Sequence, residues 1–283
     1  MNQLEVVPSI VDILKDVYGI KAIVLGGSWA AGVQRPDSDI DLGLYYQQDD
    51  PLDIDRIHKI ASELNDFANP IVSNLGEWGK WVNGGAWLTI KGQRVDFLYR
   101  NIDFVATILE DCNRGETQSD YYQQPPYGFH SYIYCAEIKL CQILHDPDGV
   151  IESLKSKVAH YPQPLKSSII KGFVWSAQFT LENAKKPAKR GDVYFTAGCI
   201  TRIATNLVQA LYALNEIYFI SDKRIHGDIE QFSIKPENFC QRIDNLLGNM
   251  GHDGQKLVET LFAAGTLLRE VIGLCGDQYR PKY

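Results

Sequence analysis

Three aspartates and a glycine-serine turn form a pattern that could bind metal and phosphate. Asp39 and Asp41 stand one residue apart in RPDSDIDLGL, and Asp96 stands in QRVDFLYR. Each lies among apolar residues of an expected strand, where an aspartate is a poor strand former and costly to bury alone. Because Mg²⁺ prefers carboxylate oxygens, the three indicate a divalent metal site. Two such ions could stabilise both the attacking and the leaving oxygen of an in-line phosphoryl displacement.

The turn before the aspartate pair offers groups for phosphate. Gly26, Gly27 and Ser28 follow the apolar run KAIVL and precede the short helical stretch WAAGV. Glycine permits close backbone approach, and N–H groups at a helix start can hold phosphate oxygens together with the Ser28 hydroxyl. Such a turn alone occurs in many loops. The competing interpretation is a plain turn followed by three solvated aspartates on an edge strand.

Hydrophobic periodicity predicts the elements that position these groups. We expect helices over 7–19 and 53–68, and strands over 21–25, 39–46 and 70–74. Residues 87–100 predict two strands joined at Lys91-Gly92, with Asp96 on the face opposite Val95 and Phe97. Further strands over 132–146 would contain Glu137, either as an extra general base or as an ordinary exposed glutamate. The nearby tryptophans either line a pocket, where they could stack on a base, or pack in the core: Trp78, Trp81 and Trp87.

From about residue 151 the apolar spacing becomes helical. The clearest case is a long helix over 192–219 with Asp192 as its N-cap, and AKKPAKRG reads as a basic loop before it. One side of this helix carries four polar residues, which form either a solvent-facing stripe or the wall of a pocket: Arg202, Asn206, Gln209 and Glu216. We therefore predict an α+β fold, a mixed sheet with flanking helices over residues 1–150, followed by an all-α helical bundle over 151–283.

Charge and composition exclude several classes of protein. Residues 1–150 hold 11 Lys+Arg against 22 Asp+Glu, and residues 151–283 hold 17 against 13, so the halves carry -11 and +4 of the net -7. An acidic first half disfavours a nucleic-acid partner. No apolar run is long enough for a membrane span, and the start MNQLEVVPSI lacks a signal sequence, which predicts a cytoplasmic protein. The six scattered cysteines suggest reduced, buried thiols.

The ordered motifs resemble nucleotidyltransferases of the DNA polymerase β superfamily. Ten residues separate Ser28 from Asp39, Asp41 completes the acidic pair, and Asp96 supplies the third acid on a later strand. The resemblance implies that Asp39 and Asp41 bind both metal ions and that Asp96 binds the catalytic one and helps to deprotonate the acceptor. It also implies that the turn, Gly27 and Ser28 above all, holds the triphosphate. More loosely, the chain is similar to antibiotic-type and minimal nucleotidyltransferases with a C-terminal helical domain.

This resemblance implies an Mg²⁺-dependent enzyme with two ions, Mn²⁺ being an alternative. Its substrate would be ATP or another nucleoside triphosphate, and its acceptor a hydroxyl of an aminoglycoside- or lincosamide-like small molecule or of a protein. In similar proteins the long helix covers the nucleotide and forms the acceptor pocket. The residues expected there are Glu137, Arg202, Asn206, Gln209 and Glu216, with Lys223 reaching a phosphate.

Other functions remain open on this sequence. One is a non-catalytic nucleotide-binding regulatory protein of the same fold, which the intact set of three aspartates disfavours. Another is an antitoxin-type protein adenylyltransferase. A polymerase-like or tRNA-directed enzyme is disfavoured, because no strongly basic channel accompanies the acidic half.

Overall fold

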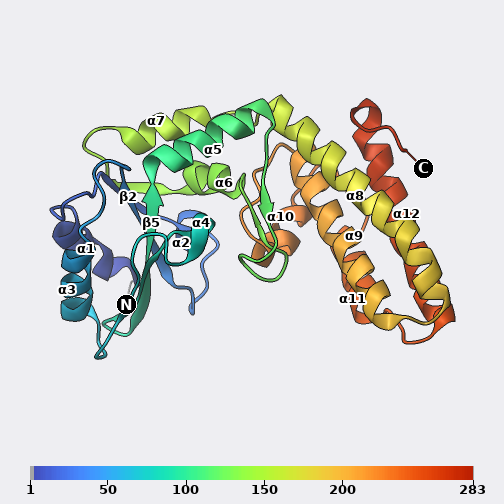
Figure 1. The fold of residues 1–283 in the computed structure, drawn as a ribbon, viewed down its shortest axis with the longest axis horizontal. Coiled ribbons are helices and arrows are strands. Elements are labelled where there is room, and N and C mark those ends of the chain that lie inside the picture. Colours follow the sequence, from blue (N-terminus) through green and yellow to red (C-terminus); the bar gives the residue numbers. More distant parts are fainter. Residues whose placement is uncertain (1–2, 283) are drawn as a thin grey trace. The chain divides into compact units, whose positions relative to one another are not determined.

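The computed structural model of the protein describes residues 3–282, and the chain divides into two compact units. The sheet unit comprises Met1–Glu110 and Ser119–His160, and the helical unit comprises Asp111–Gln118 and Tyr161–Tyr283. The first contains a six-stranded mixed sheet with flanking helices, whereas the second consists of helices (Figure 1). The predicted fold class is confirmed.

The sheet unit alternates short helices with strands. Its helical elements are η1 (Gln3–Val6), α1 (Val7–Leu14), α2 (Gly27–Ala30), α3 (Ile54–Leu64), α4 (Gly79–Val82), α5 (Ile102–Arg114), α6 (Ile133–Leu140) and α7 (Val150–Lys157). Its strands are β1 (Ala22–Leu25), β2 (Ile40–Tyr46), β3 (Ile71–Val72), β4 (Gly85–Ile90), β5 (Gln93–Asn101), β6 (Ser119–Asp120), β7 (Phe129–His130) and β8 (Gln142–His145). The last four residues of α5, Asp111–Arg114, are counted with the helical unit.

The main sheet has the strand order β3-β4-β5-β2-β1-β8. Only its central pair, β2 and β5, is parallel, and the other neighbours are antiparallel. One face packs on α1 and α3 (Figure 1), because alternate strand residues join the apolar sides of these helices in one core. Leu42, Phe97 and Ile57 are among the fully buried members of that core.

The opposite face of the sheet is covered at one end by an aromatic cluster. Trp81 of α4 stacks on Phe129 at 5.4 Å between ring centroids, and Tyr134 of α6 meets Phe129 edge-on at 5.7 Å. The Tyr134 hydroxyl donates a 2.5 Å hydrogen bond to the Trp81 carbonyl. This cluster anchors α6 over the sheet and leaves the polar residues near the start of β5 uncovered at the other end.

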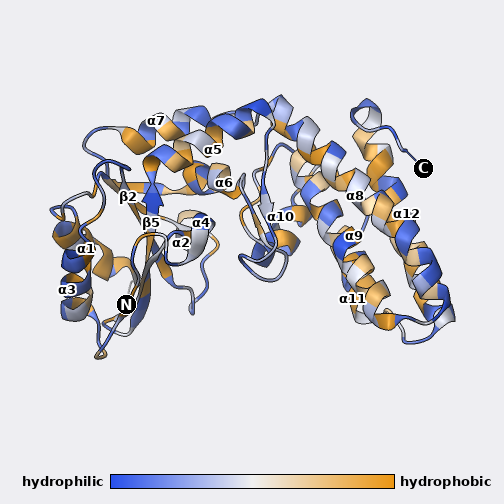
Figure 2. Ribbon diagram, viewed as in Figure 1, coloured by the Kyte–Doolittle hydropathy of each residue, from blue (hydrophilic) through white to orange (hydrophobic). Residues whose placement is uncertain are grey.

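The helical unit is built around two long helices that pack on each other, α8 and α9. Figure 2 shows apolar and polar residues alternating along both, as expected for helices that bury only part of their circumference. The elements are α8 (Gln163–Lys189), α9 (Val193–Leu214), η2 (Asp222–Arg224), α10 (Ile225–Glu230), α11 (Phe239–Gly248), α12 (Gly254–Cys275) and η3 (Gly276–Gln278). As predicted, Asp192 caps α9, its side chain accepting a hydrogen bond from the Phe195 N–H.

Three expected elements are wrong. Of the strand or two expected over 132–146, residues 142–145 form β8, but residues 133–140 form α6, because a short apolar run buried on most sides shows no period that separates helix from strand. The basic stretch AKKPAKRG is not a loop: α8 continues to Lys189, with Pro187 in its last turn. The long helix stops at Leu214, where the Asn215 side chain donates hydrogen bonds to the Leu211 and Ile234 carbonyls, both at 2.8 Å.

The structure also bears on the expected state of the cysteines and on the expected lack of a membrane span. All six cysteines are free thiols, and five of them are buried. Within residues 3–282, no helix combines the length and the apolar character needed to cross a lipid bilayer.

We predict that α1 stabilises the sheet unit through its buried side only. Ile10 is 0% exposed and Ile13 is 39% exposed on the same helix, so the two form a matched pair. Ile10→Ala should lower the free energy of unfolding by about 2–5 kcal/mol, because it leaves a cavity in the core. Ile13→Ala should cost less than about 1 kcal/mol. Denaturant titration of the two variants measures this difference, and equal losses would contradict the placement of α1.

Candidate active site

The central parallel pair of strands brings two of the predicted aspartates side by side. Asp41 of β2 and Asp96 of β5 are direct register partners, so their side chains leave the same face of the sheet. This is the face opposite the α1 and α3 core, and both aspartates are partly buried on it. Asp39 lies one residue before β2 and is also partly buried. The structure thus brings the predicted carboxylates together near one end of the two central strands, on the polar face.

The glycine turn lies against Asp41. The Gly26 N–H donates a 2.8 Å hydrogen bond to the Asp41 carbonyl, which ties the turn to β2. Gly27 has a φ of +58°, and a Cβ at this position would lie 1.7 Å from Asp41 Oδ2. Only glycine therefore fits between the turn and the carboxylate. Ser28 follows in the first turn of α2, where backbone N–H groups have no partner within the helix.

The electrostatics of this face favour a cation. Burial, followed by the charges of Asp96, Asp39 and Glu137, raises the pKa of Asp41 to about 7, against a lowering effect of Arg100. Burial and the charge of Asp39 raise the pKa of Asp96 to about 6, against Arg94. Both carboxylates are therefore costly to ionise in this partly buried, acidic surrounding, and a bound cation would relieve that cost.

Asp39 is held by an arginine in this structure. Arg94 Nε lies 2.5 Å from Asp39 Oδ1, and Arg94 also donates a 2.9 Å hydrogen bond to the Asp37 carbonyl. The side chain of Gln93 donates to the Ser38 carbonyl at 3.1 Å. The start of β5 thus fixes the segment that carries Asp39. Asp39 is partnered by a guanidinium, whereas Asp41 and Asp96 face each other.

Glu137 is the partner of a buried arginine that the sequence analysis missed. Arg100 has a side chain only 7% exposed, and its Nε and second terminal nitrogen donate to the two Glu137 oxygens, both at 2.9 Å. The charge of Glu137 raises the pKa of Arg100 even though burial opposes it. Arg100 lies four residues after Asp96 on the same strand face, which alternation in QRVDFLYR could have revealed. Glu137 is on α6 and not on a strand; its role towards an acceptor stays a prediction.

The four polar residues expected on one side of the long helix do not form a continuous exposed stripe. Asn206 and Gln209 are buried in the bundle, and Asn206 donates a 3.0 Å hydrogen bond to Ser176 Oγ of α8. Arg202 is exposed. Glu216 lies beyond the helix end with a φ of +56° and forms a 2.8 Å ion pair with Lys166. A common role in an acceptor pocket stays a prediction.

Lys223, the predicted phosphate ligand, is exposed on η2 of the helical unit. Its backbone N–H donates a 3.2 Å hydrogen bond to Ser221 Oγ within a local turn. Contact with a nucleotide stays a prediction for this side chain.

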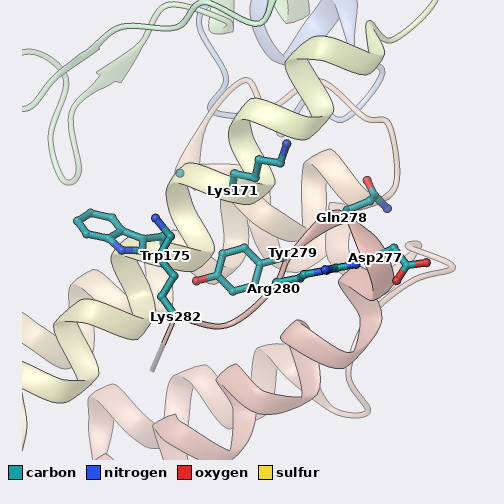
Figure 3. A pocket seen from close by; sticks show the side chains of 8 residues that line it. Lys171, Trp175, Asp277, Gln278, Tyr279, Arg280 and Lys282 are labelled. Atoms are coloured by element: carbon teal, nitrogen blue, oxygen red, sulfur yellow. The ribbon is translucent and has the colours of Figure 1, made fainter.

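The helical unit also has a hollow of about 520 Å³ between α8 and the C-terminal segment (Figure 3). It is lined by Lys171, Gly172, Trp175, Asp277, Gln278, Tyr279, Arg280 and Lys282. Tyr279 is held in place by a 2.6 Å hydrogen bond from its hydroxyl to Gln178 Oε1, and Figure 3 shows Lys282 beside Trp175. Three cations and one carboxylate make this lining more favourable for an anion than for a cation. None of the predicted site residues lines the hollow.

No three His, Cys, Asp or Glu side chains among residues 3–282 are gathered in a way that could hold a metal ion by themselves. This finding includes Asp39, Asp41 and Asp96, which interact electrostatically without forming a complete protein cage. Mg²⁺ commonly binds through one or two carboxylates and completes its shell with substrate phosphates and water. The carboxylates present suit that kind of site better than a structural metal site.

We predict that Gly27→Ala destabilises the sheet unit more than Gly32→Ala does. Both glycines have positive φ, +58° and +69°, so both alanines carry a similar backbone strain. Only the Cβ at position 27 collides with a neighbour, whereas nothing lies within 4 Å of the one at position 32. Displacing the Asp41 carboxylate should add about 1–3 kcal/mol to the loss. Denaturant titration measures both, and identical losses would show that the turn does not press on Asp41.

We also predict a pH dependence of stability that comes from Asp41. Its pKa rises from 3.8 to about 7 on folding, so the folded state holds a proton that the unfolded state has lost between these values. Stability should therefore fall as pH rises from about 4 to 7. Asp41→Asn should reduce this fall to the smaller part that comes from Asp96, whose pKa is about 6, and be more stable than the wild type at pH 7.5 by about 2–4 kcal/mol. Thermal unfolding at pH 5 and 7.5 in EDTA tests this, with the exposed Asp49→Asn as the control; parallel curves for wild type and Asp41→Asn would refute it.

Comparisons with known proteins bear on the same residues. Residues 9–73 match the family model described as polymerase beta, nucleotidyltransferase, a span that contains the glycine turn, Asp39 and Asp41 and ends before Asp96. Residues 134–223 match a family described as a domain of unknown function, DUF4037. A comparison with curated proteins gives no match.

Among solved structures, the chain is similar to a nucleotidyltransferase-like protein from Exiguobacterium sibiricum 255-15. The identity is 8%, the similarity covers 98% of this chain and 78% of that chain, and the TM-score is 0.48. The predicted resemblance itself is confirmed by the family match, in which residues 9–73 match the nucleotidyltransferase family of the polymerase beta type.

Proposed function

We propose that the protein transfers a nucleoside monophosphate, AMP from ATP, to an acceptor hydroxyl and releases pyrophosphate. The family match supports nucleotidyl transfer as the class of activity. The observation that carries the proposal is the pairing of Asp41 with Asp96 beside the Gly27 turn. Two carboxylates and a glycine turn then lie together on one sheet face.

Each residue has a separate part in the proposed reaction. Gly26, Gly27 and Ser28 hold the triphosphate, because backbone N–H groups and a hydroxyl can approach its oxygens there. The acceptor oxygen attacks the α-phosphorus while the bond to the β-phosphate oxygen breaks. Asp96 lies on the side of Asp41 away from β1, where an attacking hydroxyl would enter, and it is the proposed proton acceptor. The protein acts mainly by positioning and by charge compensation.

Divalent metal fits this donor set. Burial, followed by the charges of neighbouring carboxylates, raises the pKa values of Asp41 and Asp96, and the Arg94 guanidinium beside Asp39 shows that a cation is accepted there. Asp39, Asp41 and Asp96 would hold Mg²⁺, with Mn²⁺ as an alternative. When bound, such ions would neutralise charge on the phosphates and lower the pKa of the attacking hydroxyl. Arg94 then has to release Asp39.

The acceptor is a small molecule or a protein in this proposal. Two alternatives remain, a regulatory protein that binds nucleotide without turnover and an antitoxin-type protein adenylyltransferase. Binding of ATP with no release of pyrophosphate would favour the first. Transfer to protein hydroxyls, with none to small molecules, would favour the second.

We predict that Asp39→Asn lowers label transfer from α-labelled ATP by about 100-fold or more, because the loss of one metal-binding carboxylate weakens charge compensation in the transition state. The matched control is Asp49→Asn, an exposed aspartate near the end of β2, which should retain wild-type activity. Incubation with a panel of small-molecule and protein acceptors, scored for label transfer and pyrophosphate, gives both measurements.

The same experiment separates a catalytic Asp39 from a structural one. If Asp39 serves only to bind Arg94, then Asp39→Asn and Arg94→Gln should have the same effect on stability and leave transfer intact. Undiminished transfer by a folded Asp39→Asn protein would rule out the proposed mechanism. Circular dichroism and thermal unfolding establish that the variant is folded.

A further inference from the structure

We propose that an exposed apolar surface beside Asp96 binds the acceptor and selects one with an aromatic ring. This surface, the tryptophan platform, consists of Ile71, Trp78 and Trp87. The inference rests on the proposed nucleotidyl transfer and names the substrate class for it.

Strand register places the platform in one row with the carboxylates. Trp87 of β4 is the direct partner of Asp96, and Ile71 of β3 is the direct partner of Trp87. Asp96 in turn pairs with Asp41. Partners in adjacent strands leave the sheet on the same face, with Cβ atoms about 4.5–5.5 Å apart in antiparallel pairs. Four neighbouring strands therefore present an unbroken row of Ile71, Trp87, Asp96 and Asp41.

The apolar members of this row are unusually exposed. Trp87 is 52% exposed and Ile71 is 53% exposed, whereas Ala86 and Leu88 on either side of Trp87 are 0% and 4% exposed. Trp78 lies against the inner part of the surface, with its ring centroid 4.9 Å from that of Trp87 and an interplanar angle of 31°. A cluster of large apolar side chains left in solvent beside polar groups is typical of a binding surface.

Trp78 has a packing role that Trp87 does not share. A Cβ at Gly85 would lie 2.9 Å from Trp78 Cζ3, so the Trp78 ring covers the backbone of β4. Trp87 rests on Trp78 and keeps half of its own surface in solvent. Core packing therefore accounts for Trp78 and leaves the exposure of Trp87 unexplained.

The strand order gives the platform its place in the reaction. The phosphate turn follows β1, and the sheet then continues through β2 with Asp41, β5 with Asp96 and β4 with Trp87. In an in-line displacement the attacking oxygen enters opposite the leaving pyrophosphate. The new bond joins the acceptor oxygen to the α-phosphorus, pyrophosphate leaves with the electron pair of the broken bond, and the hydroxyl proton passes to a carboxylate or to water. A leaving group on the β1 side directs the body of the acceptor over Trp87.

The spacing of the row restricts the chemistry of the acceptor. A hydroxyl above Asp96 and a ring stacked on Trp87 are separated by about one strand spacing, roughly 5 Å. An arylalkyl alcohol of the size of 2-phenylethanol meets this condition, and its ring can stack on indole. A purely aliphatic alcohol such as 1-butanol lacks the stacking face. The acceptor class proposed is a hydroxyl compound with an aromatic ring a few bonds away.

The kinetic test compares Trp87→Ala and Trp87→Phe with wild type, using α-labelled ATP and 2-phenylethanol or 1-butanol. Trp87→Ala should raise the KM for 2-phenylethanol about tenfold and leave the KM for ATP unchanged, because only the acceptor stacks on the ring. Trp87→Phe should keep a KM for 2-phenylethanol close to that of the wild type. The KM for 1-butanol should be the same in all three proteins. The control Trp175→Ala removes an indole of the helical unit that is 38% exposed and should change neither KM. A rise in the KM for ATP instead would show that the platform binds the nucleotide base and overturn the proposal.

A second measurement does not depend on turnover. The chain has 5 tryptophans, so protein labelled with 5-fluorotryptophan gives few ¹⁹F resonances, and Trp87→Phe assigns the one from Trp87. Addition of 2-phenylethanol should shift that resonance and not that of Trp175, and 1-butanol should shift neither. An unmoved Trp87 resonance overturns the platform. If the resonance moves but no nucleotide is transferred to any acceptor, the platform is supported and the proposed function fails.

Discussion

The repulsion between Asp41 and Asp96 is the interaction on which the rest of the site depends. Parallel pairing of β2 with β5 fixes the two carboxylates as register partners on a partly buried face. Burial and the charge of Asp96 raise the pKa of Asp41, and burial and the charge of Asp39 raise the pKa of Asp96. Such an arrangement persists because the same strands are held from the other face, where Leu42 and Phe97 are fully buried in the core. Hydrophobic burial on one side thus sustains an electrostatic cost on the other.

The two arginines near this pair are each bound to a carboxylate outside it. Arg94, Asp96 and Arg100 all lie on the same face of β5, yet each arginine is bound to a different carboxylate, Arg94 to Asp39 and Arg100 to Glu137. The guanidinium groups lower the pKa of their neighbours only through space. In the proposed function the charge of Asp41 and Asp96 would be compensated by a metal ion.

Sequence alone predicted the faces of the strands and that the aspartates lie on neighbouring strands, but not the register between them. Alternation in residues 39–46 and 93–100 assigned Asp41 and Asp96 to polar faces correctly, because each strand buries its other face in one core. The register that joins β2 to β5 depends on packing between distant segments, so local pattern could not supply it. Burial also explains two differences from expectation. The α6 residues, expected as a strand, are apolar on most sides, and the polar Asn206 and Gln209 lie inside the bundle.

The polar face is closed at one end, and this decides where a substrate can enter. Beyond Asp41, a Cβ at Gly43 would lie 2.9 Å from Val24 Cγ2 and 3.0 Å from Tyr45 Cε2, so the neighbouring side chains already fill the space above the strand. One step further, Tyr45 is the register partner of Arg100, which Glu137 of α6 binds from above. Access along the strands is blocked there. In the proposed function the ligand lies across the strands, and in that direction the row runs from the Gly27 turn through the two carboxylates to Trp87.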